Sequence, residues 1–95
     1  MTVKFHPAAR SELLEARRWY VARSPVAAMA FAQEVGVAIS CIAETPIRFP
    51  WRNTGREGLL RRFPYNVFYR IVGEETVVVV AVAHQKRRPY YWRGR

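Results

Sequence analysis

Apolar residues follow two different spacings along this chain, and each spacing predicts a different kind of element. Residues 2–6 alternate Val3 and Phe5 with polar neighbours, as a short strand does. From residue 8 to about residue 23, an apolar stripe recurs every three or four positions, which is typical of a helix packed on one side. The stripe consists of Ala9, Leu13, Ala16 and Tyr20, and the charged residues Glu12, Glu15, Arg17 and Arg18 fall on other faces.

A second helix is expected from Ser24 to about Glu44. Serine followed by proline at residues 24 and 25 is a strong start signal, because serine caps a helix and proline suits its first position. Pro46 ends the helix, since proline cannot continue it. The apolar stripe consists of Ala28, Phe31, Val35, Ala38, Ile39 and Ile42. Because the link at Ser24 is short, the two helices should form an antiparallel hairpin.

The second half of the chain is expected to form strands. Residues 47–58 are a loop with a brief extended piece around residues 49–51, and residues 59–63 are a short strand before Pro64. Residues 65–72 alternate, residues 73–75 form a hairpin turn, and residues 76–83 are apolar throughout, as in a central strand covered on both faces. The predicted fold class is α+β, in the order β-α-α-β-β-β. A single domain, residues 1–95, packs a helical hairpin on a mostly antiparallel four-stranded sheet and ends in a basic tail.

Composition agrees with one folded domain. Hydrophobic residues make up 51% of the 95 residues, which is enough for a real core. A single cysteine excludes an internal disulfide and fits a reducing cytosol. No stretch approaches the roughly 18 apolar residues of a membrane helix, and the N-terminus lacks the apolar run of a signal peptide. The sequence therefore predicts a small cytoplasmic protein without a membrane partner.

Positive charge gathers in the second half of the chain. The net charge is +9, of which residues 1–45 supply +1 and residues 46–95 supply +8. Fourteen of the sixteen cations are arginine, whose forked guanidinium suits phosphate and carboxylate. This one-sided field predicts a polyanionic target, an acidic protein partner, or both. An arginine-preferring genome would account for arginine over lysine, but not for its uneven placement.

The last twelve residues carry the strongest functional signal. Residues 84–95 hold five cations and three aromatic rings without an acid. Cations bind phosphate or carboxylate, and rings stack on bases or fill a partner's pocket. The candidate target-binding residues are His84, Lys86, Arg87, Arg88, Tyr90 and Trp92. Nothing in the sequence evidently covers Trp92, so it is expected to anchor a partner. The aromatic residues expected in or beside the core are Trp19, Trp51, Tyr65 and Tyr69.

Several chemistries find no support in the sequence. Cys41 and the two histidines lack the spacing of a zinc site, and the chain contains no glycine-rich phosphate loop. Without aspartate, a Ser-His-Asp triad cannot be built. No metal or cofactor is therefore expected.

Metal-free RNA cleavage is one chemistry for which the residues suffice. Arg61 and Arg62 fall on the predicted second strand and Arg70 on the third, and adjacent strands lie only about 4.8 Å apart. Converging arginines could stabilise a phosphorane-like transition state, and a tyrosine or histidine could move the protons. The alternative is that these arginines form a solvated face of the sheet.

Three segments together resemble the RelE/ParE superfamily of bacterial toxins. They are the run from Leu60 to Arg70, the run from Val79 to His84, and Arg87-Arg88-Pro89. The resemblance also includes the strand-to-helix step at residues 5–9 and covers nearly the whole chain. It implies the toxin of a type II toxin–antitoxin (plasmid stabilisation) module, held by an acidic, partly disordered antitoxin.

The superfamily has two branches, and the resemblance implies a different use of the tail in each. ParE-like toxins inhibit DNA gyrase, whereas RelE-like toxins cleave mRNA on the ribosome. The segments look more like the ParE side, and residues 52–60 lack the lysines usual in RelE-like enzymes. If the chain is RelE-like, the resemblance implies catalytic roles for Arg61 or Arg62, for Arg87 or Arg88, and for Tyr91 or its neighbour Tyr90. The doubled residues leave both registers open.

The expected function is thus growth inhibition by a released toxin, through DNA gyrase. Ribosome-dependent mRNA cleavage is the alternative, and a non-toxic binding module on the same scaffold is a third. Truncation before Lys86 is expected to leave the fold intact and to remove toxicity.

Overall fold

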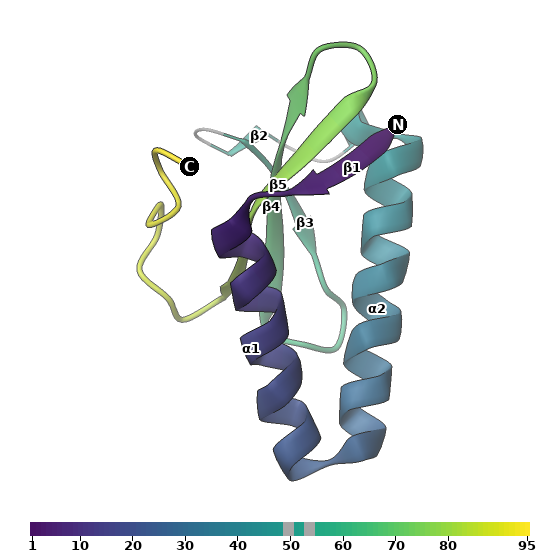
Figure 1. Cartoon of the computed structure of the whole chain (residues 1–95), viewed down its shortest axis with the longest axis vertical. Coiled ribbons are helices and arrows are strands. Elements are labelled where there is room, and N and C mark those ends of the chain that lie inside the picture. Colours follow the sequence, from purple (N-terminus) through teal and green to yellow (C-terminus); the bar gives the residue numbers. More distant parts are fainter. Residues whose placement is uncertain (49–50, 53–54) are drawn as a thin grey trace.

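Two antiparallel helices lie side by side and pack against a sheet in the computed structural model of this chain (Figure 1). The structure describes the backbone of residues 1–48, 51–52 and 55–95, and the side chains of residues 1–47, 58 and 60–95. Its elements in chain order are β1 (Thr2–Phe5), α1 (Pro7–Arg23), α2 (Pro25–Glu44), the 3-10 turn η1 (Pro46–Arg48), β2 (Trp51–Arg52), β3 (Gly55–Leu59), β4 (Tyr65–Val72) and β5 (Thr76–His84).

The helical hairpin follows the sequence prediction closely. Ser24 separates the two helices, and its Oγ accepts a hydrogen bond from the Ala27 amide at 3.2 Å, as a capping serine should. At the start of α1, His6 takes the same role, because its Nδ1 accepts from the Ala8 amide at 3.1 Å. Pro7 and Pro25 occupy the first helical positions, where no amide hydrogen is needed.

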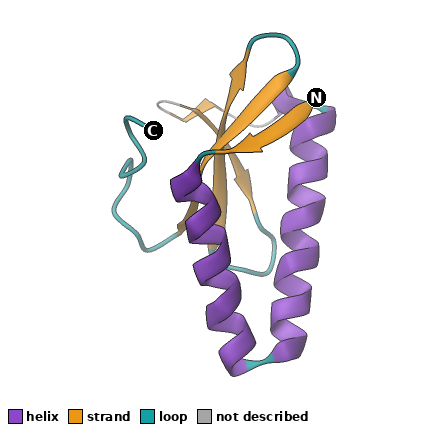
Figure 2. Cartoon of the chain, viewed as in Figure 1, coloured by secondary structure: helices purple, strands orange, loops and turns teal. Residues whose placement is uncertain are grey.

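The sheet has five strands over the described residues instead of the expected four, and it is mixed but mostly antiparallel, as expected. Its strand order is β1-β5-β4-β3-β2, and Figure 2 shows the strands in orange beside the two purple helices. β1 pairs with β5 in parallel. Parallel strands need a long connection between them, and the helical hairpin forms part of it. All other pairings are antiparallel. Of the extended piece expected at residues 49–51, only Trp51 lies within the described backbone, where it begins β2.

The second predicted strand is displaced. β3 ends at Leu59, where the prediction had that strand begin, and residues 61–64 form bends, so Arg61 and Arg62 do not lie on a strand. The physical reason is the apolar pair that flanks them. Leu60 is 5% exposed and Phe63 packs beside it, both against the helical hairpin at Ala16, Phe31 and Val35. These side chains turn the backbone inward and close the end of the core.

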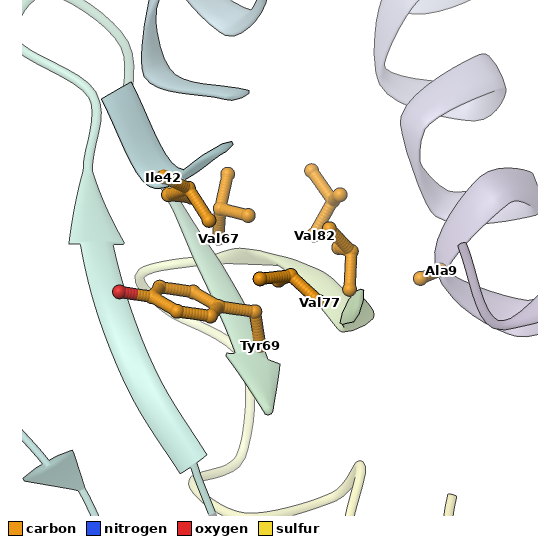
Figure 3. Close-up of a cluster of buried hydrophobic side chains, with 7 residues drawn as sticks. Ala9, Ile42, Val67, Tyr69, Val77 and Val82 are labelled. Atoms are coloured by element: carbon orange, nitrogen blue, oxygen red, sulfur yellow. The ribbon is translucent and has the colours of Figure 1, made fainter. Parts of the chain in front are cut away.

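The main core lies between the helices and the sheet. Val67 and Tyr69 of β4 are fully buried there, as their alternation predicted, together with Ala9 and Ile42 from the two helices (Figure 3). In β5, Val77 and Val79 face this core, and then the register with β4 shifts by one residue. At this shift β5 has one residue more than β4, which reverses the alternation of its side chains between the two faces of the sheet. Beyond the shift, Val82 therefore faces the helices.

The C-terminal tail covers the other face of β5. Trp92 is only 3% exposed, and its ring stacks on Phe68 with centroids 3.8 Å apart. Ala81, Ala83 and Val80 complete this second cluster, and the yellow segment in Figure 1 shows the chain turning back after β5. The expectation that nothing covers Trp92 is therefore wrong. Survival of the fold after truncation before Lys86 no longer follows either, because that cut removes part of a core.

Two further expectations concern the apolar surface of the helices. Trp19 lies at the edge of the core, as expected, because it is 50% exposed and its ring meets the Tyr20 ring with centroids 5.0 Å apart. The Arg23 guanidinium lies 3.8 Å from the Trp19 ring centroid. By length and composition alone, α2 is long and apolar enough to cross a membrane, with a mean hydropathy of 1.7. The expectation that no stretch approaches a membrane helix is therefore wrong. Within this domain, α2 buries Phe31, Val35 and Ile42 against the rest of the protein.

Replacing Trp92 with alanine should destabilise the protein far more than the same change at Trp19. Loss of a buried tryptophan typically costs about 3–5 kcal/mol, whereas an exposed one should cost under about 1 kcal/mol. Urea unfolding of Trp92→Ala and of the matched Trp19→Ala would measure both. Equal small losses would contradict the docked tail.

Candidate functional site

The end of β5 is fixed by a compact set of backbone contacts. The Gln85 amide donates to the Pro64 carbonyl at 2.8 Å, and the Arg87 amide donates to the His84 carbonyl at 2.9 Å. The Lys86 amide donates to His84 Nδ1 at 3.0 Å, so this imidazole nitrogen serves as an acceptor. The His84 ring also meets the edge of Tyr65, with centroids 5.1 Å apart. The chain therefore leaves the sheet in a defined direction.

A cavity of ≈ 200 Å³ lies between the tail and the sheet. Six of the sequence-predicted residues line it: His84, Arg87, Arg88, Tyr90, Tyr91 and Trp92. Asn66 and Phe68 of β4 contribute the wall on the sheet side. Lys86 lies in the same turn, is exposed, and does not line the cavity. The structure thus brings most of the predicted target-binding residues together.

Arg61 and Arg62 line a different hollow, beside Gln33, Glu34 and Val37 of α2. Glu34 accepts from the Arg62 amide at 2.8 Å and from Arg62 Nε at 2.9 Å. Burial of Glu34 acts to raise its pKa, but these hydrogen bonds and the charge of Arg62 outweigh burial and hold the pKa below its ordinary value. The residues named for RNA cleavage are therefore divided between two hollows, since Arg87, Arg88, Tyr90 and Tyr91 line the cavity beside the tail.

Arg87 and Arg88 differ in how they are held. The Arg87 guanidinium lies 3.9 Å from the centroid of the Tyr91 ring and 3.6 Å from Glu12 Oε2. Arg88 is exposed and makes no hydrogen bond or ion pair with any residue that the structure describes. Arg88 is thus the neighbour whose charge remains free to bind a partner.

Tyr90 and Tyr91 also differ. The Tyr91 hydroxyl is buried beside the Glu12 carboxylate. Burial, then a hydrogen bond to Glu12 and the negative charge of Glu12, raise the pKa of Tyr91 well above its ordinary 10.0. Tyr90 is 46% exposed and has a φ of 62°, an uncommon backbone conformation for a bulky residue. The reversal at Tyr90 turns Tyr91 and Trp92 inward and leaves the Tyr90 ring at the surface.

Glu12 is the residue of this region that the sequence prediction missed. It was placed on a polar face of α1, yet its side chain is only 10% exposed. Its Oε1 accepts from the Val82 amide at 3.1 Å and from Arg95 Nη1 at 2.9 Å. A signal was available, since Glu12 lies three residues after Ala9 and four before Ala16, at the edge of the apolar stripe.

Within the part of the chain that the structure describes, no three or more His, Cys, Asp or Glu side chains group so that they could hold a metal ion.

The arrangement of a helical hairpin on a mixed sheet is shared with solved structures from toxin–antitoxin systems. The chromosomal ParDE system of P. aeruginosa matches with a TM-score of 0.74 and 18% identity, over 88% of this chain and 95% of that one. The RelBE2 toxin–antitoxin complex of Mycobacterium tuberculosis matches with a TM-score of 0.58 and 29% identity, over 87% of this chain and 88% of that one. Among curated proteins, none matches.

A family model identifies the chain more specifically. Residues 3–89 match the ParE toxin of the type II toxin–antitoxin system parDE. The chain therefore belongs to the ParE toxin family, which confirms the resemblance seen in the sequence and its ParE side.

Replacing Tyr91 with phenylalanine should flatten the loss of stability at high pH. Because the folded-state pKa of Tyr91 lies above 10.0, the unfolded chain releases this proton first as pH rises. Neutral Tyr91 makes its full contribution to stability below the ordinary pKa of 10.0. This contribution is lost as the pH rises from there toward the folded-state pKa. Urea unfolding between about pH 9 and about pH 11 would measure the difference. The matched control is Tyr90→Phe, and parallel losses in Tyr91→Phe and wild type would contradict the interpretation.

Proposed function

We propose that this protein is a growth-inhibiting toxin that acts on DNA gyrase through its docked tail. The observation that carries the proposal is the arrangement of the tail itself. It gathers His84, Arg88 and Tyr90 around one cavity, while Arg61 and Arg62 lie beside α2. A cation without a partner and an exposed ring suit binding to another macromolecule. Membership of the ParE family supports the same conclusion.

Ribosome-dependent mRNA cleavage is the second candidate function, favoured by the likeness to the RelBE2 complex. The geometry supports it less well. A tyrosine already keeps its proton at neutral pH, and the raised pKa of Tyr91 makes it a still poorer candidate for a general base. Arg62 is engaged by Glu34 away from the tail. A non-toxic binding module remains the third candidate, and unimpaired growth on induced expression would favour it.

Purified gyrase provides the direct test. The wild-type protein should inhibit supercoiling or trap cleaved DNA, and Arg88→Ala and Tyr90→Ala should each weaken inhibition by about tenfold or more, as at interface hot spots. Arg10→Ala, which removes an exposed arginine from α1, is the matched control and should behave as wild type. Point variants are used here instead of truncation, because removing the tail would also remove Trp92 from the second core cluster. No effect of the wild type on gyrase, together with mRNA cuts on translating ribosomes, would reverse the ranking.

We also propose an acidic antitoxin as partner, bound on the outer face of the helical hairpin. Val26 and Met29 of α2 are 77% and 75% exposed, and Val21 of α1 is 51% exposed. A hollow of ≈ 400 Å³ runs between the helices here, lined also by Arg17. Apolar surface beside a cation suits a segment that carries apolar and acidic side chains. Both structural relatives come from toxin–antitoxin pairs.

Co-purification with the product of the adjacent reading frame would test this partner. Met29→Glu should weaken the complex by about tenfold or more, since it places an acid in an apolar contact that faces acidic side chains. Val72→Glu, at an exposed apolar site on β4, is the matched control and should leave binding unchanged. Absence of a small acidic protein that co-purifies would refute the proposal. Both partners are consistent with the expected cytoplasmic location.

A further inference from the structure

The edge of β5 is completed by side chains instead of a strand. β1 pairs with β5 only as far as Val79, and the His6 amide then bonds the Val79 carbonyl before α1 begins. Beyond this point, the Val82 amide donates to Glu12 Oε1 at 3.1 Å, and the Val80 carbonyl accepts from Arg95 Nη1 at 3.1 Å. Glu12 and Arg95 therefore take the hydrogen bonds that a neighbouring strand would make.

The same two side chains also hold each other. Arg95 Nη1 lies 2.9 Å from Glu12 Oε1, and the two side chains are 19% and 10% exposed. Arg87 reaches the second oxygen of Glu12 at 3.6 Å. One carboxylate thus joins the beginning of the tail, the end of the tail and the edge of β5. The tail segment between the two arginines is thereby held at both ends, with Tyr91 and Trp92 inside.

We infer that Glu12 is a positioning residue for the tail, one that sets which tail residues are offered to the target. With Arg87 and Arg95 held on Glu12, the segment between them turns Tyr91 and Trp92 toward the sheet. Arg88 and Tyr90 are among the side chains of this segment that stay exposed and are left for a partner. This inference rests on the proposed function in assigning target binding to the tail. The docking of the tail by Glu12 stands on the geometry alone.

Glu12→Gln keeps the shape of the side chain and removes its charge. Loss of a charge-assisted contact should shift the docking equilibrium by about tenfold. Trypsin should then cut after Lys86, Arg87 or Arg93 about tenfold faster than in the wild type, as mass spectrometry of the released peptides would show. Hydrogen exchange at the Val82 amide should accelerate as well, because this amide donates to Glu12. Glu15→Gln, one helical turn away and exposed, should match the wild type.

A second variant keeps the test decisive if Glu12→Gln fails to fold. Arg95→Met removes the other member of the ion pair and leaves Glu12 and α1 unchanged. If Glu12 acts through Arg95, the two variants combined should release the tail little more than either does alone. A purely structural effect of Glu12 on α1 would instead add to the effect of Arg95→Met, and this result would overturn the inference.

Gyrase inhibition separates this inference from the proposed function. The expected result is faster tail cleavage in Glu12→Gln together with weaker inhibition. Unchanged protection of the tail would overturn the inference whatever the target. Faster cleavage with unchanged inhibition would also overturn it, because the docked geometry would then not matter for binding. The Arg88→Ala and Tyr90→Ala variants test independently whether the tail binds gyrase, so that either idea can fail alone.

Discussion

Strand β5 has no polar face, and this constraint organises the rest of the molecule. Val77, Val79 and Val82 face the helices, whereas Ala81 and Ala83 face the other way, and all are buried. A strand of this kind needs cover on both sides. The helical hairpin supplies the first cover and the tail supplies the second. The protein therefore has two cores around one strand, and the second core is built from the segment with the most evident binding chemistry.

Because the tail both covers the sheet and carries the candidate binding residues, its side chains fall into a buried group and an exposed group. Residues that point inward, Tyr91 and Trp92, cover apolar sheet surface and are removed from contact with a target. Arg88, Tyr90 and Arg93 on either side of them remain exposed, and the backbone reverses at Tyr90. Burial of an aromatic ring stabilises the fold, whereas an exposed ring beside a free cation is available for binding. A residue's place along the reversed segment, more than its type, decides which role it takes.

The sequence predicted what local signals determine and missed what distant contacts determine. The helices followed from their stripes and from Ser24 with Pro25, because capping acts over three or four residues. Trp92 was misjudged because its cover, Phe68, lies 24 positions earlier, and a basic, aromatic run is typical of a surface. Glu12 and Arg95 are separated by 83 positions, so no local pattern could pair them. The Arg61 and Arg62 strand was wrong because Leu60 and Phe63 turn toward the helices.

The positions of the ion pairs bear on whether this fold is better suited to cleaving RNA or to binding a target. Transition-state stabilisation in a nuclease needs several cations within reach of one phosphate, held without rearrangement. Here Glu34 engages Arg62, and Glu12 engages Arg87 and Arg95, so the acids of the helical hairpin hold arginines at separate places. Binding to a macromolecular surface makes a weaker demand, because separate contacts can each add affinity without meeting at one atom. The distribution of ion pairs over this fold therefore supports the proposal that this protein acts by binding its target.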